Sequence, residues 1–153
     1  MIKMLTHNDT VQCINLMDRY SHHAHYERDE AIWIQTLITH IVESNKGNPH
    51  FLAIGDYDGD HLNGFMTCSS FKNSYNNAYV MDVRDCILDE DKRPLHTAIR
   101  LFNTMLDHVK KNGGIHWRAD SIRDGDIGKK YCDFLVRKYG AKLHHNVRGI
   151  IGG

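Results

Sequence analysis

The stretch that decides the fold reads AYVMDVRDCIL (78–88), DEDKR (89–93) and PLHTAIRLFNTMLDHVKK (94–111). Its first part predicts a long strand, and its last part predicts a helix that begins at Pro94, a residue suited to the first helical turn. Apolar residues at helical spacing predict the buried face of this helix. They are Ala98, Leu101, Phe102, Met105 and Val109. Gly113 and Gly114 end the helix, and residues 115–122 predict another strand. Strand, helix and strand in this order predict a parallel, right-handed crossover.

The remaining sequence supplies further strands and helices, with no internal repeat or linker. Short runs typical of strands occupy residues 2–6, 50–55, 62–71 and 142–151. Helical spacing predicts a helix capped by Asn8, Asp9 or Thr10, then helices over about 30–44 and 126–139. Residues 21–29 predict a loop or a helix break, and Gly140 suits the left-handed position after the last helix.

Each of these helices has a predicted buried face. In the first, Val11, Ile14 and Met17 share one face. In the second, the apolar positions are Ile34, Leu37, Ile38, Ile41 and Val42, with Trp33 nearby. In the last, they are Ile127, Tyr131, Phe134 and Leu135. We expect these faces to pack on the sheet.

The segment DYDGD (56–60) has two possible readings. A calcium loop would need Gly where His61 stands and Glu where Thr67 stands. A hairpin turn with Gly59 at a positive-φ position explains the segment better.

The order of these elements, β-α-α-β-β-β-α-β-α-β, predicts an α/β fold with a mixed, mostly antiparallel central sheet flanked by helices on both faces. The 153 residues are expected to form a single domain, 1–153. In such sheets ligands bind where a strand meets the next helix, which points to residues 86–98.

Composition limits the class of protein. The 19 basic and 19 acidic residues balance, which argues against a broad nucleic-acid-binding surface. No apolar run approaches the ~20 residues of a membrane span, and residues 1–17 do not look like a signal peptide. The four cysteines are scattered with no CxxC pair. We therefore expect a cytoplasmic protein with reduced thiols, no membrane association and no nucleic-acid partner.

The 12 histidines are unusually many. The clusters are His22, His23 and His25, with His40 further along, and the pair His144 and His145. They lack HExxH spacing and nearby ligands on a helix face, so solvated or partly buried histidines are favoured and no metal is expected. A metal-dependent regulator is the alternative that these clusters leave open.

Two segments resemble the GNAT N-acetyltransferase superfamily, and the order of elements extends the resemblance over nearly the whole chain. The segment DCILDEDKRPLHTAIRLF (85–102) resembles the family's strand and Arg/Gln-x-x-Gly-x-Gly/Ala loop. Arg93 fits the first position and Ala98 the last, whereas His96 stands in place of the central glycine. The segment FLVRKYGA (134–141) is similar to the family's helix end before the last strands.

The resemblance implies that acetyl-CoA is the co-substrate. Backbone N–H groups at a helix start and the helix dipole would hold its pyrophosphate. The implied contacts are Arg93, Pro94, Leu95, His96, Thr97 and Ala98, and the backbone of Cys86, Ile87 and Leu88 would pair with the pantetheine arm. Pro94 removes one donor and His96 adds a side chain. Arg93, Lys92 or a protonated His96 would compensate by pairing with phosphate.

The resemblance places the catalytic base at Asp85, with Asp82 as an alternative. Alternate residues of a strand face opposite sides, so the two carboxylates share a face only if a bulge lies between them. Ion-paired or solvated aspartates beside Arg84 are the competing interpretation. Val136 stands where the family commonly has a tyrosine that acts as the general acid, and Tyr131 and Tyr139 are expected to be packing residues.

The implied activity is transfer of an acetyl group to an amine of a small molecule or a protein. The alternative is a catalytically inactive GNAT-like module in a larger assembly, for example a phage particle, and the sequence leaves the choice open. The loops 21–32 and 71–78 would select the acceptor. The family usually ends in two strands, whereas one is predicted here (142–151), so an uncovered edge favours a homodimer through this strand.

Overall fold

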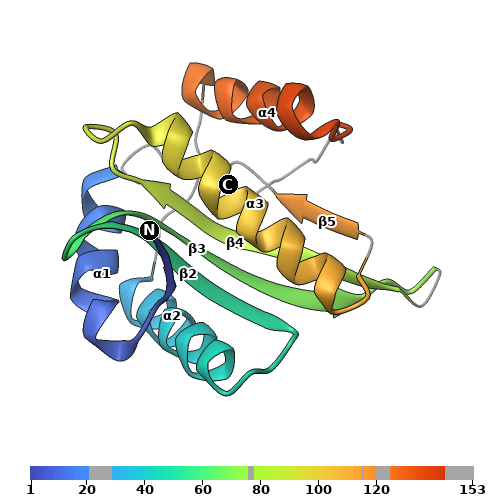
Figure 1. Ribbon diagram of the computed structural model, residues 1–153, viewed down its shortest axis with the longest axis horizontal. Helices are drawn as coiled ribbons and strands as arrows, with labels where there is room; N and C mark the ends of the chain where they lie inside the picture. The colour runs from blue at the N-terminus through green and yellow to red at the C-terminus, as the bar shows by residue number, and fades with distance from the viewer. Residues whose placement is uncertain (21–28, 76–77, 115, 120–124, 144–153) are drawn as a thin grey trace, which may run out of the picture.

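The computed structural model describes residues 1–20, 29–75, 78–114, 116–119 and 125–143 (Figure 1). Its strands are β1 (Ile2–Met4), β2 (Phe51–Asp58), β3 (His61–Lys72), β4 (Tyr79–Leu88) and β5 (His116–Ala119). Its helices are the 3-10 helix η1 (His7–Asp9), α1 (Thr10–Tyr20), α2 (Glu30–Asn45), α3 (Pro94–Lys111) and α4 (Gly125–Tyr139). These elements follow the predicted order, except that the predicted strand 142–151 lies almost wholly outside the described residues.

The five strands form one sheet in the order β1-β2-β3-β4-β5. The first three pairings are antiparallel, and β4 pairs with β5 in parallel. The parallel pair is the predicted crossover, with α3 as its connection. Helices α1 and α2 lie on one side of the sheet, and α3 and α4 lie on the other (Figure 1). The predicted fold class is confirmed.

Each face of the sheet carries its own apolar core. On the α1 and α2 side, Leu16, Met17, Leu37 and Ile41 pack with Phe65 and Ile87 of the sheet. On the α3 and α4 side, Leu101, Phe102 and Met105 pack with Met66, Cys68 and Val83. The predicted buried face of α3 is confirmed at all five positions. Phe102 lies at its centre, because four aromatic rings surround it.

The predicted faces of α1 and α2 were partly wrong. Val11 is 66% exposed, and the buried positions of α1 are Cys13, Leu16, Met17 and Tyr20. In α2 the outward-facing Ile38 and Val42 are more than two-fifths exposed, whereas His40 and Ser44 are buried. Polar residues can take the inner face because they find local partners: Ser44 Oγ accepts from the Ala53 N–H, and His40 Nδ1 lies 2.7 Å from the Thr36 carbonyl oxygen.

The predicted turns are confirmed. Gly59 has φ 59° in the β2–β3 hairpin, and Gly140 has φ 65° after α4. Both values lie in the left-handed region, which a side chain would disfavour. The clustered histidines at 22, 23, 25, 144 and 145 lie outside the described residues. Within the described part, no helix combines the length and the apolar character that crossing a membrane requires.

Candidate active site

A bulge in β4 decides where its two aspartates point. Thr67 pairs with Asp85, but the next residue of β3, Cys68, pairs with Val83, so Arg84 is an extra residue in β4. Residues opposite each other in an antiparallel pair lie on the same face. Asp85 opposite Thr67 and Asp82 opposite Ser69 are therefore both on the side of the sheet that α2 covers. The bulge that the sequence left undetermined is present.

Asp85 is half-buried under the start of α2. One of its oxygens, Oδ2, accepts from the Trp33 indole Nε1 at 3.2 Å and from the Thr67 hydroxyl at 3.0 Å. Burial raises the pKa of the Asp85 carboxyl above its usual range, although the bonds from Thr67 and Trp33 oppose this shift. Both bonds reach the same oxygen. The other oxygen, Oδ1, has no partner within the described ranges, so a carboxyl with a raised pKa keeps one oxygen available for proton transfer.

Asp82 has a different environment on the same face. It is buried, and Arg118 donates to both of its oxygens at 3.0 and 3.4 Å. The Arg84 Nε lies 3.3 Å from its Oδ2. Two guanidinium groups thus hold this carboxylate in ion pairs. Of the two candidate bases, Asp82 therefore fits the ion-paired interpretation and Asp85 fits the catalytic one.

In the described residues, all of β5 pairs with the first half of β4. Their described pairing ends where Val83 meets Ala119. The bulge follows directly, and residues 85–88 continue along β3 past the described end of β5. Asp85 thus lies at the point where the described parallel pairing stops, and Cys86, Ile87 and Leu88 lead from it to the start of α3.

The loop that opens α3 takes a strained turn at Arg93. This residue has φ 44° and ψ 58°. Among the described residues other than glycine, it alone has a positive φ. Such a conformation costs roughly 1–3 kcal/mol and is common at ligand-binding sites. The turn points the Arg93 carbonyl at the amides of His96 and Thr97, at 3.1 and 3.2 Å. Pro94 has no N–H to donate. The amides of Arg93 and Leu95 have one, and it has no acceptor among the described residues.

The side chains of the turn divide by exposure. Lys92, Arg93 and His96 are exposed beside the helix start, where the charges of Lys92 and Arg93 favour an anion. Thr97 and Ala98 are buried, so they offer a ligand only their backbone. Thr97 packs so closely on β3 that a Cβ on Gly64 would lie 2.9 Å from its methyl group. The helix start is therefore fixed against the sheet while its cationic side chains stay accessible.

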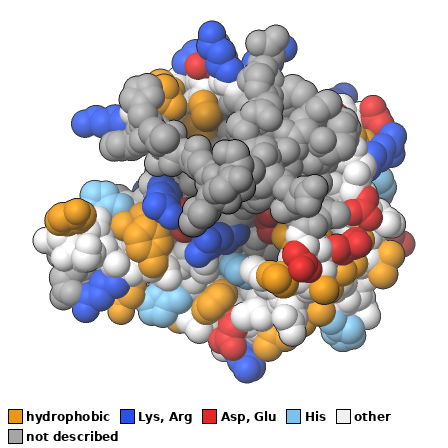
Figure 2. Space-filling model, turned by 180° about the vertical axis from the view of Figure 1, so that it is seen from behind, with side chains coloured by type: hydrophobic (Ala, Val, Ile, Leu, Met, Phe, Trp, Pro, Cys, Tyr) orange, Lys and Arg blue, Asp and Glu red, His pale blue; other side chains and the backbone are white. Residues whose placement is uncertain are grey.

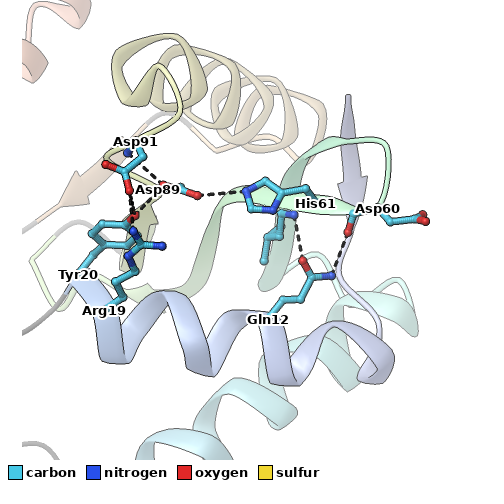
Figure 3. Close-up of polar contacts among 8 residues, drawn as sticks. Gln12, Arg19, Tyr20, Asp60, His61, Asp89 and Asp91 are labelled. Carbon is cyan, nitrogen blue, oxygen red and sulfur yellow. Dashed lines mark hydrogen bonds and ion pairs between the residues drawn. The ribbon is translucent and has the colours of Figure 1, made fainter.

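A buried carboxylate, Asp89, anchors the same loop (Figure 3). Its oxygens accept from the Tyr20 hydroxyl at 2.7 Å and the Asp91 amide at 3.0 Å, and they lie 3.0 Å from His61 Nε2. Its own amide donates to the carbonyl of Asn63, the extra residue of a second bulge in β3. We call Tyr20, His61, Asp89 and Asp91, with Arg19, the Asp89 cluster.

The Asp89 cluster joins three parts of the fold. Arg19 at the end of α1 donates to Asp91 at 2.7 Å. Near its start, α1 also contacts the β2–β3 hairpin. There the Gln12 side chain donates to the carbonyl of Asp60 and accepts from the amide of Leu62 (Figure 3). Burial and the bond to Asp89 raise the pKa of Tyr20 to about 12, so this hydroxyl stays a donor at neutral pH. The loop before α3 is thus held by α1 and by the hairpin.

Sequence reasoning missed the partners of both carboxylates. Trp33 and Thr67 were expected only as packing and strand residues, and Tyr20 and His61 had no assigned role. No local pattern links them, because the partners of Asp85 and Asp89 are 18 to 69 positions away in the chain. The charged run at 89–93 resembles a solvated loop, and only the tertiary structure buries its first residue.

The tyrosines near the end of α4 pack as expected. Tyr131 and Tyr139 contact the ring of Phe102, and the Tyr139 hydroxyl donates to Asn103 Oδ1 at 3.1 Å. Val136 is 39% exposed. In the part of the chain that the structure describes, no group of three or more His, Cys, Asp or Glu side chains is arranged to hold a metal ion.

Solved structures share this fold. A ribosomal-protein-alanine N-acetyltransferase from Brucella melitensis biovar Abortus 2308 superposes with a TM-score of 0.70 and 16% identity, covering 98% of each chain. The aminoglycoside 6'-N-acetyltransferase AAC(6')-IG from Acinetobacter haemolyticus gives 0.71 and 13%, covering 98% of this chain and 96% of its own. The PaiA N-acetyltransferase from Thermoplasma acidophilum, solved with coenzyme A, gives 0.69 and 18%, covering 87% and 86%.

No protein-family model matches the chain, and no curated protein matches it by sequence. The likeness is therefore one of structure. It covers nearly the whole chain, and the chain has the fold of the GNAT N-acetyltransferases. The resemblance drawn from residues 85–102 and 134–141 is confirmed at the level of the fold.

Proposed function

We propose, from the premise of this GNAT fold, that the protein transfers an acetyl group from acetyl-CoA to a primary amine. The observation that carries the proposal is Asp85, a half-buried carboxyl with a raised pKa that lies just past the last described pair of β4 and β5. The Thermoplasma structure contains coenzyme A, and the other two relatives are named for acetylation of a protein or an aminoglycoside. Their names support the reaction class and leave the acceptor open.

In the proposed reaction the acceptor nitrogen attacks the thioester carbonyl. A C–N bond forms, the C–S bond breaks, and coenzyme A leaves as a thiolate that takes a proton from solvent. Asp85 accepts the amine proton on Oδ1, because Oδ2 is occupied by Trp33 and Thr67. A backbone N–H of β4 beside the bulge would stabilise the negative charge that develops on the carbonyl oxygen.

The start of α3 would bind the pyrophosphate. The amides of Arg93 and Leu95 have no acceptor among the described residues and lie at the positive end of the helix dipole, with the cationic side chains of Lys92 and Arg93 and the imidazole of His96 around them. The backbone of Cys86, Ile87 and Leu88 would pair with the pantetheine arm between this loop and Asp85. The Asp89 cluster would keep the loop in the conformation that binds.

Binding and transfer are tested separately. Acetyl-CoA at 100 times its dissociation constant should stabilise the fold by ~2.7 kcal/mol in a thermal-shift experiment. His96→Glu places a negative charge at the helix start and should abolish the shift. Lys138→Glu, an equivalent change on α4, is the control and should leave it intact. Absence of any shift with millimolar acetyl-CoA in the unmodified protein would refute the proposal.

A second candidate is a GNAT-like module that binds a partner without catalysis. The observation that favours it is the small number of available amides at the start of α3. Pro94 has none, and those of Lys92, His96 and Thr97 are already bonded within the chain. A module of this kind would show no acetyl-CoA shift, so the same experiment separates the two candidates.

A further inference from the structure

We infer that the acceptor is a zwitterionic amine, with a carboxylate or another anionic group within a few bonds of the reacting nitrogen, as in a free amino acid. This inference rests on the proposed function. It comes from Arg84, the extra residue of the β4 bulge, which neighbours Asp85 and shares its face of the sheet. Together they present one cationic and one anionic group side by side.

The position of the Arg84 guanidinium is fixed by two contacts. Its Nε donates to Ser69 Oγ at 3.2 Å and lies 3.3 Å from Asp82 Oδ2. Ser69 and Asp82 are on the face that carries Asp85, so the guanidinium is on that face too. It is near enough for its charge to lower the pKa of Asp85, a smaller effect than the raising effect of burial.

The charges around Arg84 leave it able to bind an anion. Asp82 is its carboxylate partner, but the same carboxylate also accepts two bonds from Arg118. Two guanidinium groups thus share the carboxylate of Asp82. The Arg84 side chain is 53% exposed, and its two Nη groups form no hydrogen bond or ion pair with the described residues. Paired Nη groups are the donors that bind a carboxylate or phosphate bidentately.

An acceptor of matching polarity would place its amine at Asp85 and its anionic group at Arg84. A polycation such as an aminoglycoside would meet the Arg84 charge instead. Both acidic and basic side chains of the described residues lie on the face of the molecule opposite to that in Figure 1 (Figure 2). The site therefore favours a different acceptor class from that of the aminoglycoside acetyltransferases that share the fold.

The test compares amino acids with the amines formed by their decarboxylation, which differ only in the carboxylate. The pairs are lysine and cadaverine, phenylalanine and phenethylamine, histidine and histamine, and tryptophan and tryptamine. Release of the coenzyme A thiol gives kcat/KM for each, with kanamycin as a polycationic acceptor. The amino acid of the preferred pair should exceed its amine at least tenfold, and Arg84→Gln should reduce that ratio at least tenfold.

Two variants show whether the effect belongs to the guanidinium. Arg84→Lys keeps the charge but not the fork of donors, so it should retain part of the preference. Arg137→Gln removes the same charge from α4, on the opposite side of the sheet, and should leave the ratio unchanged. Calorimetry with acetyl-CoA is run on every variant.

The outcomes separate this inference from the proposed function. No binding of acetyl-CoA by the unmodified protein overturns both. If acetyl-CoA binds, the inference is overturned when amines or kanamycin are preferred, when no member of any pair is acetylated, or when Arg84→Gln leaves the ratio as it was. The inference is supported if the unmodified protein prefers the amino acid, Arg84→Gln abolishes that preference, and Arg137→Gln leaves it intact.

Discussion

The Tyr20→Phe substitution tests whether the Asp89 cluster holds the loop that would bind acetyl-CoA. It removes the hydroxyl that donates to the buried Asp89 at 2.7 Å and leaves the ring in place. A hydrogen bond to a charged group contributes about 1.5–3 kcal/mol to the free energy of unfolding. For a chain of this length each kcal/mol lowers the unfolding temperature by about 2–4 °C, so the expected decrease is about 3–12 °C. Tyr75→Phe, the same change on a ring that is 97% exposed, should shift it by less than about 2 °C.

The pH dependence of this difference identifies its origin. Burial by itself would raise the pKa of Asp89, but the bonds from Tyr20, the Asp91 amide and His61 outweigh it and hold the pKa below its usual range. A lowered pKa stabilises the fold above the unfolded-state pKa of ~3.9, and that stability is lost as the pH falls through the folded-state pKa. Urea unfolding should therefore show a large difference between Tyr20→Phe and the unmodified protein at pH 7 and a smaller one at pH 3.

Two results would contradict this reasoning. An equal difference at pH 3 and pH 7 would mean that the hydroxyl does not act through the charge of Asp89. An equal loss in Tyr75→Phe would mean that the loss is not specific to the cluster. If the cluster also positions the loop, Tyr20→Phe should weaken acetyl-CoA binding at least threefold in calorimetry, measured at a temperature where the variant is folded.

Three further changes test the site and its supports. Asp85→Asn keeps an oxygen for Trp33 and Thr67 but cannot accept the amine proton, so kcat should fall at least hundredfold while calorimetry shows acetyl-CoA affinity within about threefold. Because burial raises the pKa of Asp85, the acid limb of kcat/KM should lie above the ~3.9 of a free aspartate. Trp33→Phe removes a donor to the carboxylate and should move that limb to still higher pH in a pH–rate profile. Gly64→Ala puts a Cβ 2.9 Å from the Thr97 methyl group and 3.0 Å from the Ile87 carbonyl oxygen, which should cost about 1–3 kcal/mol in urea unfolding.

The sequence predicted the fold well where local signals agree. Pro94 at the start of α3, its apolar stripe and the glycines after it all favour the same helix, and the structure begins and ends it as predicted. The β2–β3 hairpin was predictable because Gly59 has a backbone requirement that few residues meet. The face of α2 was less predictable, because apolar residues occur around most of its circumference and Ser44 and His40 replace them on the inner side.

The candidate site was predictable in position but not in detail. The resemblance placed Asp85 and the start of α3 at the site from short motifs. The partners of Asp85 depend on strand register, and a single extra residue in β4 changes the face of every side chain after it. Nothing local in the sequence around Arg84 marks that bulge. The burial of Asp89 likewise depends on Tyr20 and His61, which reach it only when α1 and the hairpin are in place.

The bulge at Arg84 gives two aspartates three positions apart different chemistry on one face of one strand. In a regular strand without the bulge, Asp82 and Asp85 are three positions apart and would point to opposite faces, and Asp85 would meet the apolar core under α3. With it, Asp82 receives the two arginines, which keep its charge paired, whereas Asp85 receives one indole and one hydroxyl, which are neutral and leave burial as the dominant effect on its pKa. Arg84, two positions after Asp82, lies on the same face by ordinary strand alternation. The bulge therefore accounts for the position of the proposed base and for its burial under α2, next to the cationic group that we infer selects the acceptor.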